Sequence, residues 1–114
     1  GDAKAVGVAG SRAIMSFEGD RFLRERGGTL QVMLGLHPRA KPEALTVSVY
    51  SNELKLGEIS LLEQARVQQA FEIPAGTVTL GKNILTLVVE RPAKATIGPR
   101  EALVALRDLQ LTVH

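Results

Sequence analysis

The chain has 114 residues, a formal net charge of +2 and no cysteine. This length fits one domain of ordinary size, because two halves of about 57 residues would be marginal without disulfides or metals. The lack of cysteine excludes a disulfide framework and the usual structural zinc sites, and the small charge gives no support to nucleic-acid binding. We therefore expect residues 1–114 to form a single domain, and the start at Gly1 predicts that it was excised from a longer chain.

Hydrophobic residues make up 45% of the chain, whereas aromatic residues make up only 4%. The core must therefore be built mainly from leucine, valine, isoleucine and alanine. No apolar run approaches the roughly 20 residues that a membrane-spanning helix needs. The composition predicts one aliphatic core and no direct insertion into a membrane.

Short apolar stretches follow one another along the chain. Most of them alternate apolar and polar residues, which is typical of half-buried strands, and one is β-branched and almost wholly apolar, which favours a more central strand. The strands predicted in chain order are 13–17, 29–34, 45–50, 54–61, 67–73, 77–80, 84–89 and 109–113. The residues predicted to face inward in the two clearest alternating stretches are Leu30, Val32, Leu34, Leu45, Val47 and Val49.

Turn-forming residues separate these stretches. Glycine and asparagine tolerate positive φ, and proline fixes φ, so clusters of these residues favour turns. Such clusters lie at 27–28, 38–42, 51–52, 74–76, 81–83 and 98–99. Strands at this spacing indicate an all-β fold, and we expect an antiparallel β-sandwich of about eight strands.

Two segments are also compatible with short helices. Ser60 and Glu63 have the spacing of a capping box, and the apolar residues that follow could form a stripe as far as Phe71. Residues 100–109 also place leucine and alanine at helical spacing. The sequence leaves helix, strand or loop open for 60–71 and for 100–109.

Residues 45–87 carry a recurring pattern. An alternating strand leads into a tight turn at 51–52, a later strand ends in Ile-Pro at 73–74, and Gly-x-Asn at 81–83 opens a long strand. The pattern resembles galactose-binding-like jelly-roll modules, as found in carbohydrate-binding-like domains of polysaccharide synthesis and degradation proteins. The stretch 100–111 is similar to the closing part of some of these modules.

This resemblance implies a jelly-roll sandwich that acts as a non-catalytic accessory module. It implies carbohydrate binding in an envelope or exopolysaccharide system and an extracytoplasmic location, periplasmic or cell-surface. The alternative is a structural or protein-interaction domain of a larger envelope, surface or virion protein. The expected partner is thus a polysaccharide or another protein chain. The chain departs from the family pattern in lacking the usual hairpin glycine and nearly all ring-stacking aromatic residues.

The candidate ligand-binding residues are few. Tyr50 could stack on a sugar ring, and Asn52, Arg91 and Arg100 could donate planar hydrogen bonds to hydroxyl or carboxylate groups. The alternative for each residue is structural. Tyr50 would then lie on the solvent side of its strand, Asn52 would serve the turn, and Arg100 would pair with an acid.

No residue pattern indicates catalysis. Glu18 and Asp20 lie near each other in the sequence without any sign of a cleft, so a solvated turn is the favoured interpretation. His37 and His114 lack metal-ligand spacing. We expect no enzymatic activity, no metal and no cofactor.

Basic residues gather at 20–26, where acidic neighbours dilute the charge. We favour a solvated, salt-bridged turn there over an anion-binding surface. The aromatic residues expected in the core are Phe17, Phe22 and Phe71.

Overall fold

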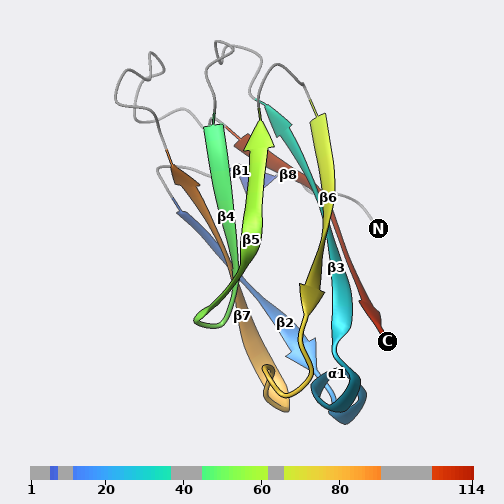
Figure 1. Cartoon of the computed structure of the whole chain (residues 1–114). Coiled ribbons are helices and arrows are strands. Elements are labelled where there is room, and N and C mark those ends of the chain that lie inside the picture. The colour runs from blue at the N-terminus through green and yellow to red at the C-terminus, as the bar shows by residue number, and fades with distance from the viewer. Residues whose placement is uncertain (1–5, 8–11, 37–44, 62–65, 91–103) are drawn as a thin grey trace.

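The computed structural model describes residues 6–7, 12–36, 45–61, 66–90 and 104–114, which form strands and one short helix (Figure 1). In chain order these elements are β1 (Val6–Gly7), β2 (Arg12–Gly19), α1 (Arg21–Arg26), β3 (Gly28–Leu36), β4 (Leu45–Ser51), β5 (Leu54–Leu61), β6 (Arg66–Ile73), β7 (Gly81–Glu90) and β8 (Val104–Val113).

The strands form two antiparallel sheets of four, with the orders β1-β8-β3-β6 and β2-β7-β4-β5 (Figure 1). The pairing is nested: β1 pairs with β8, β2 with β7, β3 with β6 and β4 with β5. A chain pairs in this way when one long antiparallel hairpin is wrapped into two layers. The predicted antiparallel β-sandwich is confirmed.

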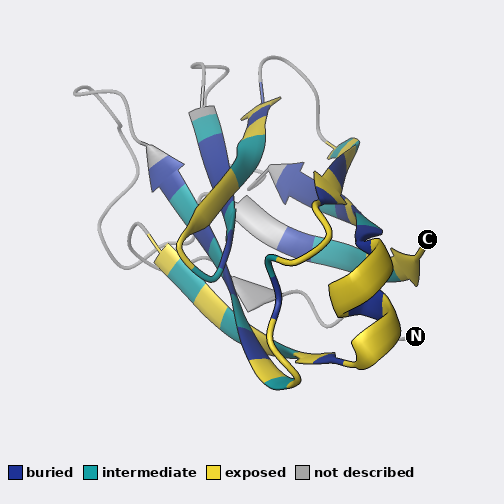
Figure 2. Cartoon of the chain, turned by 60° about the horizontal axis from the view of Figure 1, so that its bottom comes forward, coloured by how far each residue is buried: buried dark blue, intermediate teal, exposed yellow. Residues whose placement is uncertain are grey.

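The core lies between the two sheets and is almost entirely aliphatic. Five of the six residues predicted to face inward are at most 3% exposed, and the side chain of Leu45 lies outside the described residues. Phe71 is also buried, while Phe17 is partly buried against the core. Figure 2 shows buried, intermediate and exposed residues following one another along the strands, and mainly exposed residues on α1.

The strand predictions are confirmed with one exception. Seven of the eight predicted segments lie within β2 to β8, and β7 opens at Gly81 with φ of 92°. The predicted strand at 77–80 is wrong, because this segment is a loop. Its hydrogen bonds are local, since the Thr77 hydroxyl donates to Pro74 O and the Thr79 N–H donates to Asn83 Oδ1.

Both helical alternatives are wrong wherever the structure describes the chain. Residues 66–71 belong to β6, and residues 104–109 belong to β8. The remaining parts of those two segments are 60–61, which end β5, and 62–65 and 100–103, which lie outside the described residues. In β6 and β8 alternate residues face the core, so burial favours the two-residue period over helical spacing.

Within the segment 20–26, Arg21–Arg26 form the helix α1 rather than the predicted salt-bridged turn. The Asp20 carboxylate accepts a hydrogen bond from Leu23 N at 2.8 Å and so caps α1, while Gly27 ends the helix with φ of 74°. Leu23 anchors it in the core. Phe22 is 41% exposed, which corrects its expected place in the core, and the guanidinium groups of Arg21 and Arg26 lie over its ring. No helix in the described parts of the chain has the length and apolar character to cross a membrane.

Candidate functional site

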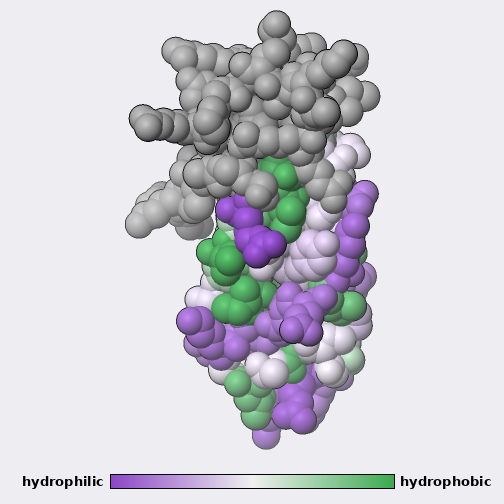
Figure 3. All heavy atoms as spheres, turned by 90° about the vertical axis from the view of Figure 1, so that its left-hand side faces the viewer, coloured by the Kyte–Doolittle hydropathy of each residue, from purple (hydrophilic) through white to green (hydrophobic). Residues whose placement is uncertain are grey.

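Tyr50 lies on the outer face of the sheet β2-β7-β4-β5. The strand register places it in one row with Thr86 and Ile14 on one side and Lys55 on the other. Its side chain is half-buried, and Ile14 is 61% exposed. Figure 3 views the molecule from this side and shows hydrophobic groups scattered among hydrophilic ones. Tyr50 is therefore accessible only in part, and its row contains a threonine, an isoleucine and a lysine but no amide side chain.

Asn52 occupies the turn between β4 and β5 with φ of 54°. Its backbone N–H donates to Ile84 O at 2.7 Å, and its Oδ1 accepts from Ile84 N at 2.9 Å. Its Nδ2 donates to Asn83 Oδ1 at 3.0 Å. The Asn52 amide group thus joins the hairpin to β7, in agreement with the structural alternative.

Asn83 was predicted only as a turn residue, yet it has a larger structural role. Its side chain is fully buried, its Oδ1 accepts from Thr79 N, and its Nδ2 donates to Thr79 O and Gly81 O. Together with Asn52 it holds the β4–β5 turn and the loop before β7 against each other. The predicted site residues Arg91 and Arg100 lie outside the described residues, so the structure does not place them beside Tyr50.

A second set of polar side chains covers the outer face of the other sheet. Gln31 on β3 is paired with Gln110 on β8, while Met33 is paired with Gln68 on β6 and with Asp108 on β8. Paired residues, and residues two apart on one strand, point to the same side of a sheet. We call the surface formed by Gln31, Gln68, Gln110 and Asp108 the amide face.

The amide face exposes groups that both donate and accept hydrogen bonds. All three glutamines are exposed, and Asp108 is half-buried. Gln68 Nε2 donates to Gln31 Oε1 at 3.3 Å, and Gln110 Nε2 donates to Asp108 Oδ2 at 3.3 Å. Each carboxamide carries two donor protons and an acceptor oxygen, so most of this capacity stays open to a ligand.

Different groups lie at the two ends of the amide face. At one end, the Thr29 hydroxyl lies 2.9 Å from Glu72 Oε1 and 2.7 Å from His114 Nε2. At the other end, Arg66 opens β6 and Arg107 lies on β8. Met33 is half-buried between the amides and provides an apolar surface among them.

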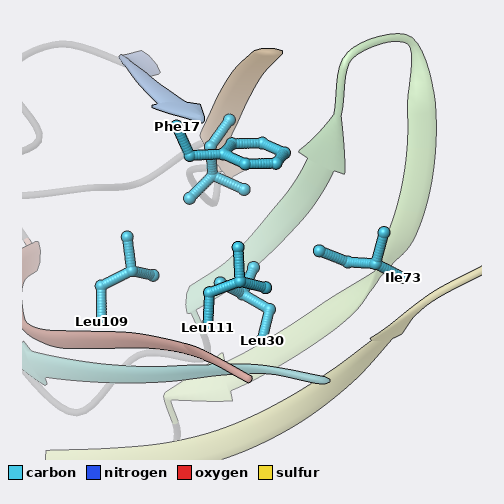
Figure 4. Close-up of a pocket in the computed structure, with 6 residues that line it drawn as sticks. Phe17, Leu30, Ile73, Leu109 and Leu111 are labelled. Atoms are coloured by element: carbon cyan, nitrogen blue, oxygen red, sulfur yellow. The ribbon is translucent and has the colours of Figure 1, made fainter. Parts of the chain in front are cut away.

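An apolar pocket opens between the sheets. It has a volume of about 90 Å³ and is lined by Phe17, Leu30, Ile73, Leu85, Leu109 and Leu111 (Figure 4). Phe17 lies across the pocket from Leu109 and Leu111, which come from the other sheet (Figure 4). None of the six side chains can form a hydrogen bond, so the pocket does not suit a polyhydroxylated ligand. Within the described parts of the chain, no three histidine, aspartate or glutamate side chains gather as metal ligands.

Sequence reasoning missed the amide face, although part of the signal was present. Gln31 and Gln110 each stand between two apolar residues of a predicted strand, which already directs them outward. The missing information was which strands are neighbours. β3 lies between β8 and β6, and these strands are far apart in the sequence.

No family model matches the sequence, and no curated protein matches it significantly. Among solved structures, one described as "EclA C-terminal domain; sugar-binding protein" is similar to this chain with a TM-score of 0.64. The similarity covers 97% of this chain and 72% of that chain, at 17% sequence identity. At this identity the likeness establishes a shared all-β sandwich fold.

Proposed function

We propose that the chain is a non-catalytic carbohydrate-binding module and that the amide face is its binding surface. The amide face is the observation that carries the proposal. Three exposed carboxamides and one carboxylate lie together on three adjacent strands, around the apolar side chain of Met33. A sugar ring also combines polar and apolar groups, with hydroxyl groups at its rim and C–H groups on its faces. The hydroxyl groups can bond to the amides while the C–H groups pack on Met33.

Two further observations support the proposal. The fold is similar to that of a domain described as sugar-binding. The nested strand order and the sequence pattern of residues 45–87 both suit a galactose-binding-like jelly roll. The resemblance of the sequence to galactose-binding-like modules also underlies our proposal of an extracytoplasmic role in envelope or exopolysaccharide handling. Fractionation of cells that produce the full-length parent protein tests the location.

Calorimetric titration of single variants tests the binding surface. A panel of neutral and acidic oligosaccharides first identifies the tightest ligand. Gln68→Ala and Gln110→Ala should each lower the affinity for that ligand about three- to tenfold, because each removes hydrogen bonds worth about 0.5–1.5 kcal/mol. Both positions are exposed, so the fold should be retained.

Tyr50→Ala is the matched variant on the opposite sheet. It should leave the affinity unchanged, because Tyr50 belongs to the other face of the sandwich. Loss of binding in Tyr50→Ala together with full binding in both glutamine variants would move the site to that face. Absence of binding across the whole panel would contradict the proposed function.

A protein-interaction domain is the second candidate. Ile14 is 61% exposed on β2, which is an edge strand of its sheet. Ile84 and Val88 are half-exposed on the same outer face. Light scattering on the domain with and without its parent chain tests whether the domain forms a complex. If the complex uses this face, Ile14→Lys should abolish it.

A further inference from the structure

Resting on the proposed function, we infer that the preferred carbohydrate is anionic, and that Arg66 and Arg107 bind its carboxylate or sulfate group at one end of the amide face. The inference starts from the way in which the sheet places these two side chains. Arg66 is paired with Gly35 across the β3–β6 ladder. Arg107 approaches the same glycine from β8.

A β-bulge brings Arg107 to this position. Met33 is paired with Asp108, but the next residue, Leu34, is paired with Leu106, so Arg107 is left without a partner on β3. Bulges of this kind re-aim a side chain out of the regular alternation of the strand. The Arg107 side chain lies across Gly35, where an added Cβ would stand 2.7 Å from Nε and 3.2 Å from Cγ. Glycine at position 35 thus makes room for the arginine.

The hydrogen-bonding capacity of Arg107 is not used within the described part of the chain. Its Nε is buried and has no hydrogen-bond partner. Buried donors of this kind are rare in proteins, and leaving one unpaired is unfavourable. Among the described residues, Lys55 forms an ion pair with Glu58 and His114 Nε2 lies 3.2 Å from Glu72 Oε2, and neither contact involves Arg66 or Arg107.

Asp108 is the acidic residue closest in sequence to this arginine. Its Oδ2 accepts from Gln110 Nε2, and no ion pair joins it to Arg107 within the described structure. Asp108 and the glutamines can therefore form hydrogen bonds with sugar hydroxyl groups, while the two guanidinium groups bind the acidic group of the ligand. Arginine presents a planar fork of N–H donors that fits the two oxygens of a carboxylate or sulfate. The expected ligand is a uronic-acid or sulfated glycan lying along the amide face.

Four polymers separate the contributions of sugar and charge. Polygalacturonate carries carboxylates on sugars, heparin carries sulfates and carboxylates on sugars, dextran is a neutral glycan, and polyglutamate carries carboxylates without sugars. We expect polygalacturonate or heparin to bind at least tenfold more tightly than either dextran or polyglutamate. The affinity for the acidic glycan should fall as the salt concentration rises, because the contact is electrostatic.

Single substitutions test the two arginines. Arg66→Gln and Arg107→Gln should each lower the affinity for the acidic glycan about tenfold or more, since each removes hydrogen bonds to a charged group. Gly35→Ala should also weaken it, because the new Cβ displaces the Arg107 side chain. The matched control is Arg12→Gln, which makes the same charge change on the exposed side of β2 in the other sheet and should alter the affinity less than twofold. Circular dichroism verifies that each variant is folded.

The outcomes distinguish this inference from the proposed function. If dextran binds as tightly as the acidic glycans, and both arginine variants bind normally, the acidic specificity is wrong while carbohydrate binding stands. If polyglutamate binds as tightly as the glycans, the surface recognises charge alone and the inference fails. If none of the four polymers binds the folded protein, the inference also fails, and the oligosaccharide panel decides the proposed function separately.

Discussion

Individual polar side chains have two different roles in this domain. Asn52 and Asn83 are committed to the protein, because their amide groups bond to each other and to the backbone of neighbouring segments. Gln31 and Gln68 bond to each other, Gln110 bonds to Asp108, and all three glutamines remain exposed. Both groups carry the same carboxamide, so the chemistry of the side chain alone does not explain the difference. Burial does, since Asn83 is fully buried and the glutamines are exposed.

Replacing Asn83 should test its structural role. Asn83→Ala leaves the N–H and C=O of Thr79 and the C=O of Gly81 without these partners. We expect the free energy of unfolding to fall by about 3 kcal/mol, because the substitution removes several hydrogen bonds of a fully buried side chain, each worth about 0.5–1.5 kcal/mol. Urea denaturation measures this change. Thr112→Ala on the exposed side of β8 is the control and should change it by less than about 0.5 kcal/mol. Equal effects in the two variants would contradict the role given to Asn83.

At the scale of elements, α1 links the two sheets at one end of the sandwich. It follows β2 of one sheet and precedes β3 of the other, and Gly76 N donates to Arg24 O at 2.6 Å. One face of the helix buries Leu23, whereas Phe22 projects outward between two arginines. The helix has six residues and is therefore too short to be stable without tertiary contacts.

Neighbouring residues of α1 should thus differ in their contribution to stability. Leu23→Ala should lower the free energy of unfolding by about 3 kcal/mol, because it removes a buried side chain and leaves a cavity. Phe22→Ala should lower it by less than about 1 kcal/mol, since this ring is 41% exposed. Thermal and urea unfolding of both variants provide the comparison. A larger loss in Phe22→Ala would mean that the helix is anchored by its outer side.

The lengths of the elements explain why the sequence predicted most strands and missed the helix. Strand alternation is local and repeats over many residues, as in β3 and β4, so it survives without knowledge of the fold. Helix α1 offers too few residues for a periodic pattern, and its signals were confined to its ends, at Asp20 and Gly27. The loop at 77–80 has β-branched residues, but hydrogen bonds from Asn83 hold it outside the sheet.

At the scale of the whole molecule, the nested strand pairing determines which residues lie together on each outer face. Each sheet alternates between early and late strands, so every outer face combines residues from distant parts of the sequence. The amide face therefore could not be predicted from local pattern, whereas the aliphatic core could, because inward residues share one layer whatever the strand order. Tyr50 was found from its residue type, and its isolation from the glutamines follows from the topology.

The most direct test of the sugar-binding surface is a map of the side-chain amide signals by nuclear magnetic resonance during titration with the tightest oligosaccharide. Asn52 and Asn83 provide internal controls on the opposite sheet. We predict that the side-chain NH₂ signals of Gln31, Gln68 and Gln110 shift together and saturate at one affinity, while those of Asn52 and Asn83 stay in place. Shifts confined to Tyr50 and its neighbours on β4 and β7, with the three glutamine signals unmoved, would contradict the account.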